Sequence, residues 1–383
     1  MKLARTLSVI GLGLLAAGYV GVSQGCSSSS SSTPTGSVGG PPAKPNAPVT
    51  TSTDEHNYAL YTLLLGDTDR ANNPSTTAWK KFGYNIDGKV SDKTSTDVCT
   101  LVSGANKDTQ VDGENGIDNS FGSRIVPIIQ TFTHDISKQL TTSLQSGSFT
   151  IMIDTVGLSG DPAQTNTGLT GQLFAGGKFD NPTFTTNDKW PVLPELLNGS
   201  DVKSGSKVKF TDAFVVGGTW VNGVGTDVTI SLSISGQALS LVIHRATITF
   251  THSGGLADNG TIAGVINTQE LIDGLKAVAG NISDSLCSGS AFDSIAQQIK
   301  QASDIMSDGT NGPGQTCDGI SIGLGFTAKE IAPPSAVAPA AGPGTNKCNG
   351  TDGGVDDSGT DTGTGTDTGT GTDTGTGTDT GTD

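Results

Sequence analysis

The 383-residue sequence has little positive charge: 21 Lys and Arg stand against 37 Asp and Glu, for a formal net charge of −16. Proteins that bind duplex nucleic acid normally present clustered positive charge, so this shortage argues against a nucleic-acid partner. Apolar residues make up only 33% of the chain and aromatic residues only 5%. Both ends are polar and of low complexity, which accounts for the low apolar share and leaves a centre that can fold.

The chain also lacks clear catalytic signatures. Residues 319–323 match the G-x-S-x-G pattern of serine hydrolases, but no helix follows and the alternation of apolar residues runs straight through Ser321. We therefore expect a strand there and predict no catalytic residue. This favours a non-enzymatic protein, although the enzyme question stays open. A carbohydrate-active hydrolase is the alternative, because its two carboxylates need to be close only in space.

Only one long hydrophobic run occurs, at residues 6–22, and it follows Lys2 and Arg5. Gly25 and Cys26 come directly after it. This layout resembles a bacterial lipoprotein signal, in which residues 1–25 are removed and Cys26 becomes the lipidated N-terminus. Ser27 is not the Asp that often retains lipoproteins at the inner membrane, so we expect an outer-membrane lipoprotein facing the periplasm or the cell surface. Ordinary secretion and an uncleaved anchor are the alternatives.

Composition divides the rest of the chain into three parts. Residues 26–53 are rich in Ser, Pro, Gly and Thr, which predicts a disordered tether. Residues 54–348 are long enough to bury a sizeable core and form the predicted folded domain. Residues 349–383 repeat Asp, Thr and Gly without an apolar position, which predicts a disordered tail.

Alternating apolar residues indicate strands in the folded domain. Residues 228–234 alternate strictly, which is typical of a strand with one buried face. The alternation slips by one residue near His244 and Arg245, where we expect a β-bulge. Gly217 and Gly218 indicate a two-residue hairpin turn. Further strands are predicted at 149–156, 169–175, 208–216, 219–221, 261–266 and 320–327.

Three segments have helical spacing instead. The first predicted helix covers 123–145, with Pro127 in its first turn. The second begins after Asn267, whose spacing to Glu270 resembles a capping box, and the third covers 292–306. The predicted fold class is therefore α+β: mainly an antiparallel β-sheet or sandwich with about three packed amphipathic helices.

Four cysteines remain besides Cys26, and an even number in an exported chain favours disulfides over metal binding. Cys287 and Cys317 bracket the third predicted helix, so we favour that bridge, with Cys99 and Cys348 as the second. The four cysteines allow three pairings, and the sequence does not exclude the other two.

Acidic residues are densest in the segment 112–119, just before the first predicted helix. Asp112, Glu114 and Asp118 supply hard oxygen ligands at a spacing that could hold Ca²⁺. The alternative is a turn whose acids favour the start of the following helix. Calcium is therefore the one cofactor that the sequence suggests.

Two internal segments, Ala-Trp-Lys-Lys-Phe-Gly-Tyr-Asn-Ile-Asp-Gly at 78–88 and Gly-Ile-Asp-Asn-Ser-Phe-Gly at 116–122, accompany the lipoprotein-like start and the Asp/Thr/Gly tail. Together they resemble a group of uncharacterised predicted lipoproteins from myxobacterial-type genomes, over residues 54–330. The resemblance implies a location and no activity. We therefore expect a lipid-anchored envelope or surface protein, a binding or structural module whose partners are the membrane and a glycan or other envelope component. Calcium-dependent glycan binding is a further alternative.

Overall fold

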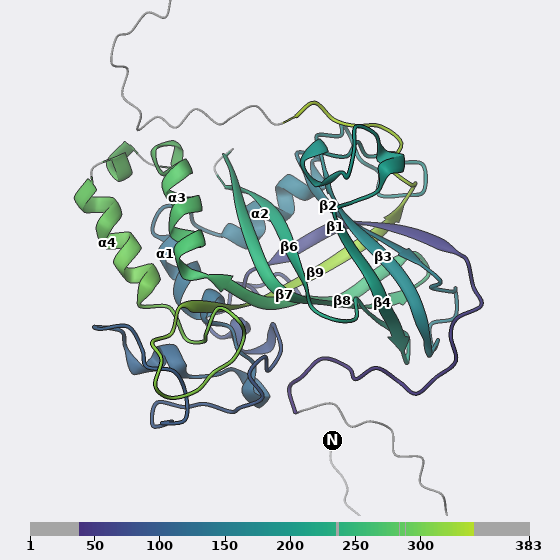
Figure 1. Cartoon of the computed structure of the whole chain (residues 1–383). Coiled ribbons are helices and arrows are strands. Elements are labelled where there is room, and N and C mark those ends of the chain that lie inside the picture. Colours follow the sequence, from purple (N-terminus) through teal and green to yellow (C-terminus); the bar gives the residue numbers. More distant parts are fainter. Residues whose placement is uncertain (1–37, 235–236, 283, 288, 341–383) are drawn as a thin grey trace, which may run out of the picture.

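The computed structural model describes residues 38–234, 237–282, 284–287 and 289–340 (Figure 1). Most of the regular structure in these residues is β-strand. The strands are β1 (Glu55–Leu64), β2 (Thr150–Val156), β3 (Asn166–Gly176), β4 (Val208–Val216), β5 (Thr219–Val221), β6 (Thr226–Ile234), β7 (Gln237–Ser253), β8 (Leu256–Asn267) and β9 (Gly319–Ile331).

Eight of these strands close into an antiparallel barrel. The order β5-β4-β3-β2-β1-β9-β8-β7 returns to its start because Trp220 of β5 lies opposite Phe250 of β7. The 17-residue strand β7 is long enough to serve two neighbours, since its first half pairs with β6 and its second half with β5. β6 therefore extends the sheet as a ninth strand outside the closed ring.

The predicted α+β sheet or sandwich with about three helices was wrong, because the domain is a closed barrel with four short helices in the part of the chain described. Alternation of apolar and polar residues shows which face of a strand is buried. This alternation is the same in an open sheet and in a closed barrel, so it does not distinguish them. β1, the strand that joins β2 to β9, has no such period. Its residues are buried on both faces, with Leu60 in the barrel interior and Ala59 in an outer apolar cluster.

One apolar cluster fills the barrel, and all eight strands contribute to it. The Phe250 ring belongs to this cluster, and its centroid lies 5.1 Å from that of Trp220 and 5.3 Å from that of Tyr58. Each of these three side chains is at most 2% exposed. The barrel is therefore a packed body, and close packing makes it a rigid support for its loops.

Two helices replace the predicted single helix over 123–145, which was wrong. A π-helical turn leads into α1 (Val126–Gln130), and α2 (Ile136–Gln145) follows after a break at Asp135, where φ is 54°. The apolar spacing continues across the break, so periodicity alone did not reveal it. α2 packs on β1 and β6, and its Leu140 belongs to the interior cluster.

The other two helices begin close to the predicted positions. The Asn267 side chain accepts a hydrogen bond from the Gln269 amide at 2.9 Å and so caps α3 (Thr268–Ile282). α4 (Gly289–Lys300) ends six residues before the predicted end at Met306. Both helices lie beside the β6–β7 end of the barrel (Figure 1).

Two local features of the strands are confirmed. The pairing of β7 with β8 shifts between His244 and Thr247, and Arg245 has a φ of 52°, which together form the expected bulge. Gly217 and Gly218 join β4 to β5 as a two-residue turn with φ values of 54° and 77°. Positive φ at both central residues is typical of a type I′ hairpin turn.

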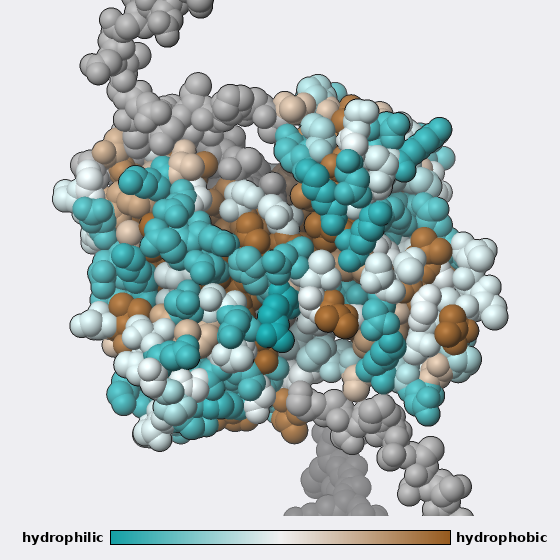
Figure 2. Space-filling view, viewed as in Figure 1, coloured by the Kyte–Doolittle hydropathy of each residue, from teal (hydrophilic) through white to brown (hydrophobic). Residues whose placement is uncertain are grey.

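The outer surface is mixed in character. Residues 38–53, which the sequence assigns to the tether, lie along the barrel, where Val49 bridges Thr167 and the Gly39 carbonyl accepts from the Asn85 amide. On the face in Figure 2, hydrophilic and apolar residues alternate without one dominant apolar patch. Exposed large apolar residues are scattered through the fold at Val38, Val49, Val90, Phe132, Val224 and Leu256.

Candidate functional site

The long connection from β1 to α1 contains the acidic residues that the sequence singled out. The Asp118 carboxylate lies 3% exposed and accepts hydrogen bonds from the amides of Ile86, at 2.6 Å, and Asp87, at 3.3 Å. The Asp112 carboxylate accepts from the Ser91 amide at 2.5 Å. These acids therefore fix the turn at 85–91 by binding its backbone amides.

Asp112 and Asp118 also meet each other. The charge of Asp112 is one of the groups that disfavour ionisation of the Asp118 carboxyl group. Burial, reinforced by the nearby Asp87 carboxylate, raises the pKa of Asp112 to about 7. Burial likewise raises the pKa of Asp118 well above its usual range, helped by the charges of Asp87, Asp112 and Asp304.

Glu114, the third predicted calcium ligand, does not join this pair. Its carboxylate lies 3.6 Å from the Lys81 ammonium, and both side chains are mostly exposed. Within the described residues no three His, Cys, Asp or Glu side chains form a group suited to a metal ion. The structure thus brings together two of the three predicted ligands, and calcium binding stays a prediction.

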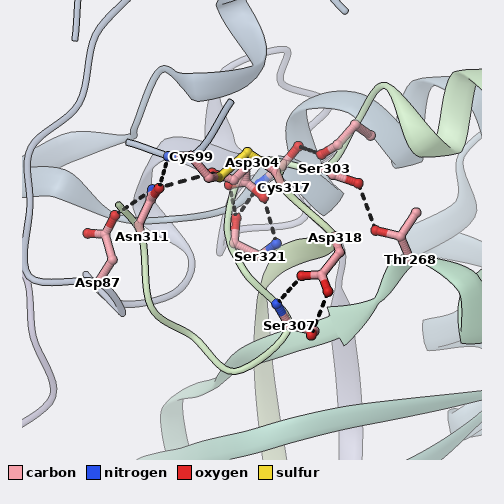
Figure 3. The surroundings of a disulfide bond; sticks show 12 residues. Asp87, Cys99, Thr268, Ser303, Asp304, Ser307, Asn311, Cys317, Asp318 and Ser321 are labelled. Atoms are coloured by element: carbon pink, nitrogen blue, oxygen red, sulfur yellow. Dashed lines mark hydrogen bonds between the residues drawn. A yellow bond between two sulfur atoms is a disulfide. The ribbon is translucent and has the colours of Figure 1, made fainter. Parts of the chain in front are cut away.

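A disulfide lies beside Asp304, one of the residues whose charge acts on Asp118 (Figure 3). Cys99 is bonded to Cys317, so both predicted bridges, Cys287–Cys317 and Cys99–Cys348, were wrong. Backbone pairing explains the difference, because Thr100 bridges Thr316 in parallel and so places the two cysteines together. Sequence proximity favoured a local bridge, whereas the return of the chain into β9 makes a long-range one.

The remaining cysteines are only partly described. Cys287 is disulfide-bonded. Cys348 and the predicted lipid-bearing Cys26 lie outside the described residues.

Asn311 links the disulfide to the acids. Its side-chain amide donates to Asp87 at 2.8 Å and to the Asp304 carbonyl at 3.3 Å, while its oxygen accepts from the Cys99 amide at 2.6 Å (Figure 3). We use the name acidic cluster for Asp87, Asp112, Asp118 and Asp304.

Sequence reasoning missed Asp87 and Asp304 as members of this cluster, and Asp304 stands alone between α4 and β9 without a motif. It is 8% exposed, and its carboxylate accepts from the Ser321 amide at 2.9 Å and from the Ser321 hydroxyl at 2.5 Å (Figure 3). Burial raises the pKa of Asp304 to about 7. Ser321 lies within β9, which confirms the strand predicted for the G-x-S-x-G segment.

Asn119 anchors the same loop to the barrel. Its amide nitrogen donates to the carbonyls of Phe82, at 3.1 Å, and Gly323, at 3.0 Å, while its oxygen accepts from the amides of Gly122 and Gly323. A buried side chain with this many partners determines the path of the backbone around it. We use the name loop layer for residues 65–125 and 301–318, which the acidic cluster, Asn119 and the disulfide hold on the barrel.

The chemistry open to this arrangement is limited by burial. Asp118 and Asp304 lie beneath the loops, where a polymeric substrate does not reach them. No helix within the described residues is long and apolar enough to cross a membrane. Comparison of the chain with models of protein families, with curated proteins and with solved structures gave no match.

Proposed function

We propose that this chain is an outer-membrane lipoprotein whose barrel domain is a non-enzymatic binding module for an envelope component such as a glycan. The observation that carries the binding role is the packed interior around Trp220 and Phe250, which makes the barrel a support and leaves the loop layer as the candidate binding surface. Binding residues are often placed on loops held by a rigid scaffold. The anchor at Cys26 and the membrane as partner rest on the N-terminal signal alone.

The anchor is tested on the mature N-terminal peptide. Mass spectrometry should find an acylated Cys26, and the Cys26→Ala chain should leave the membrane fraction. An unmodified peptide that begins at another residue contradicts the lipoprotein assignment. A Cys26→Ala chain that still partitions into detergent contradicts it as well.

Binding is tested with the full chain in detergent on a glycan array and in pull-downs with peptidoglycan and lipopolysaccharide. We expect one of these polymers to be retained without release of sugar fragments. Release of reducing ends would instead favour the carbohydrate-active hydrolase. Retention of none of them would contradict the binding role.

Calcium is tested on the same chain because Asp112 and Asp118 offer two carboxylates to a cation. If Ca²⁺ binds only the folded state, it stabilises by about 2.7 kcal/mol at a free concentration of 100 Kd. Calcium should then raise the melting temperature of the wild type. It should also raise that of Glu114→Gln, because the Glu114 carboxylate pairs with Lys81 and not with the two aspartates. The shift should vanish in Asp118→Asn. An unchanged melting temperature of the chelated wild type in millimolar calcium contradicts the site.

A further inference from the structure

His244 occupies an unusual position on the bulge of β7. The extra residue lets Ile243 and Ala246 both face the interior, each 0% exposed, so His244 and Arg245 both turn outward. The His244 side chain is only 24% exposed because two acidic residues lie against it.

Both ring nitrogens of His244 are engaged by carboxylates. Nδ1 lies 3.1 Å from Asp227 at the start of β6, and Nε2 lies 2.9 Å from Glu270 in the first turn of α3. An ionised carboxylate only accepts hydrogen bonds, so both nitrogens must donate, and only the imidazolium does so. The charged ring therefore joins two elements that are otherwise separate in the sequence.

The remaining surroundings of His244 favour the charge. Arg245, on the same strand, directs its guanidinium to the Asp308 carbonyl, and Val265, opposite on β8, is apolar. Burial lowers the pKa of His244, but the hydrogen bonds to Glu270 and Asp227 outweigh this effect and the pKa is raised above its usual value.

Glu270 does not make the capping-box contact that the sequence suggested. In a capping box its side chain would return to the Asn267 amide, but here it reaches His244 instead. Asp227 has a second role, since it also accepts from the Arg245 amide at 3.1 Å. Loss of one proton from His244 therefore releases Glu270 more readily than Asp227.

We propose that His244 is a pH-sensitive clamp, which as an imidazolium ties the first turn of α3 to the bulge of β7 and as a neutral ring releases it. Further along, α3 also supplies Leu275 and Ala279 to an apolar cavity that it shares with α1 and α4.

The sign of the effect follows from the raised pKa. The stabilising contribution is fully present below the usual histidine pKa of about 6.5 and is lost as the pH rises through the higher value of the folded state. Asp227 and Glu270 are more than half exposed. We therefore expect a modest local change, about two- to fivefold in the opening of the first turn of α3, as for surface ion pairs.

The test combines histidine NMR with hydrogen exchange on the full chain between pH 5.5 and 8.5. His244 should titrate above the usual histidine pKa of about 6.5. After correction for intrinsic exchange, the amides at the start of α3 should lose protection two- to fivefold across that titration. His134→Gln should keep this step, and His244→Gln should abolish it.

Glu270→Gln is a second test, needed because His244→Gln could remove the step simply by destabilising the bulge. It leaves the His244–Asp227 contact in place, and it should lower the pKa of His244 and remove the step in α3 protection. The proposal is overturned if wild-type His244 titrates at or below its usual value. It is equally overturned if α3 protection shows no step in the wild type or keeps its step in either variant.

Discussion

Asp304 is buried, and none of the described groups that act on its carboxylate is a cation. Hydrogen bonds from the amide and hydroxyl of Ser321 stabilise the Asp304 carboxylate, but burial outweighs them and raises its pKa above the usual range. The folded state holds the proton up to about pH 7, whereas an unfolded Asp releases it near pH 4. Stability contributed at this residue is therefore present at acidic pH and falls as the pH rises from about 4 to 7.

Asp304→Asn should remove this dependence because the amide stays neutral. At pH 8 the free energy of unfolding should rise by up to about 4 kcal/mol, and the difference from the wild type should shrink toward pH 4. Chemical denaturation across pH 4–8 measures both. Asp318→Asn is the control, since that exposed carboxylate also accepts from a serine amide and hydroxyl, those of Ser307. Parallel profiles for wild type and Asp304→Asn would show that the residue does not titrate as described.

Among the elements, the hairpin from β4 to β5 shows what sequence can specify. Its strands have the predicted bounds because side-chain alternation and a Gly-Gly turn act within a few residues of each other. The sequence lacked such a signal for β1, which is buried on both faces, and for the break at Asp135. The sequence also predicted that Asp112 and Asp118 lie in one loop. Their proximity to Asp304 depends on long-range folding, which no local sequence pattern predicts.

The two glycines of this turn should differ sharply in their tolerance of alanine. Both have positive φ, but an added Cβ at Gly217 meets open space, whereas at Gly218 it would lie 1.8 Å from the Pro162 carbonyl oxygen. Gly217→Ala should lower the free energy of unfolding by about 1 kcal/mol through backbone strain alone. Gly218→Ala should lower it by at least about 1 kcal/mol more, since the loop at 157–165 must move.

Urea unfolding of the two variants gives this comparison directly, with each serving as the control for the other. Equal losses would mean that the 157–165 loop does not press on the turn.

At the scale of the whole molecule, the disulfide between Cys99 and Cys317 closes a very long loop of the chain. Cys99 and Cys317 are 218 residues apart. The chain-entropy relation assigns such a bridge about 5 kcal/mol, and removal of native disulfides typically costs about 2–5 kcal/mol. The bond therefore accounts for a large fraction of a typical domain stability.

The double variant Cys99→Ser/Cys317→Ser should lose about 3–5 kcal/mol of unfolding free energy without loss of the barrel. Denaturant titration gives the free energy, and circular dichroism at low denaturant reports the β-structure. The loop layer should become susceptible to proteases before the strands do. A loss below about 1 kcal/mol would show that the bridge adds little to the contacts around it.

The pairing of β1 with β9 also determines when the barrel can form. His56 and Glu330 touch at 2.7 Å across 274 residues of chain. Until β9 arrives, β1 has one unpaired edge, and such an edge invites association with other chains. A chain cut short before β9 would keep that edge open, so we expect it to aggregate instead of forming a smaller barrel.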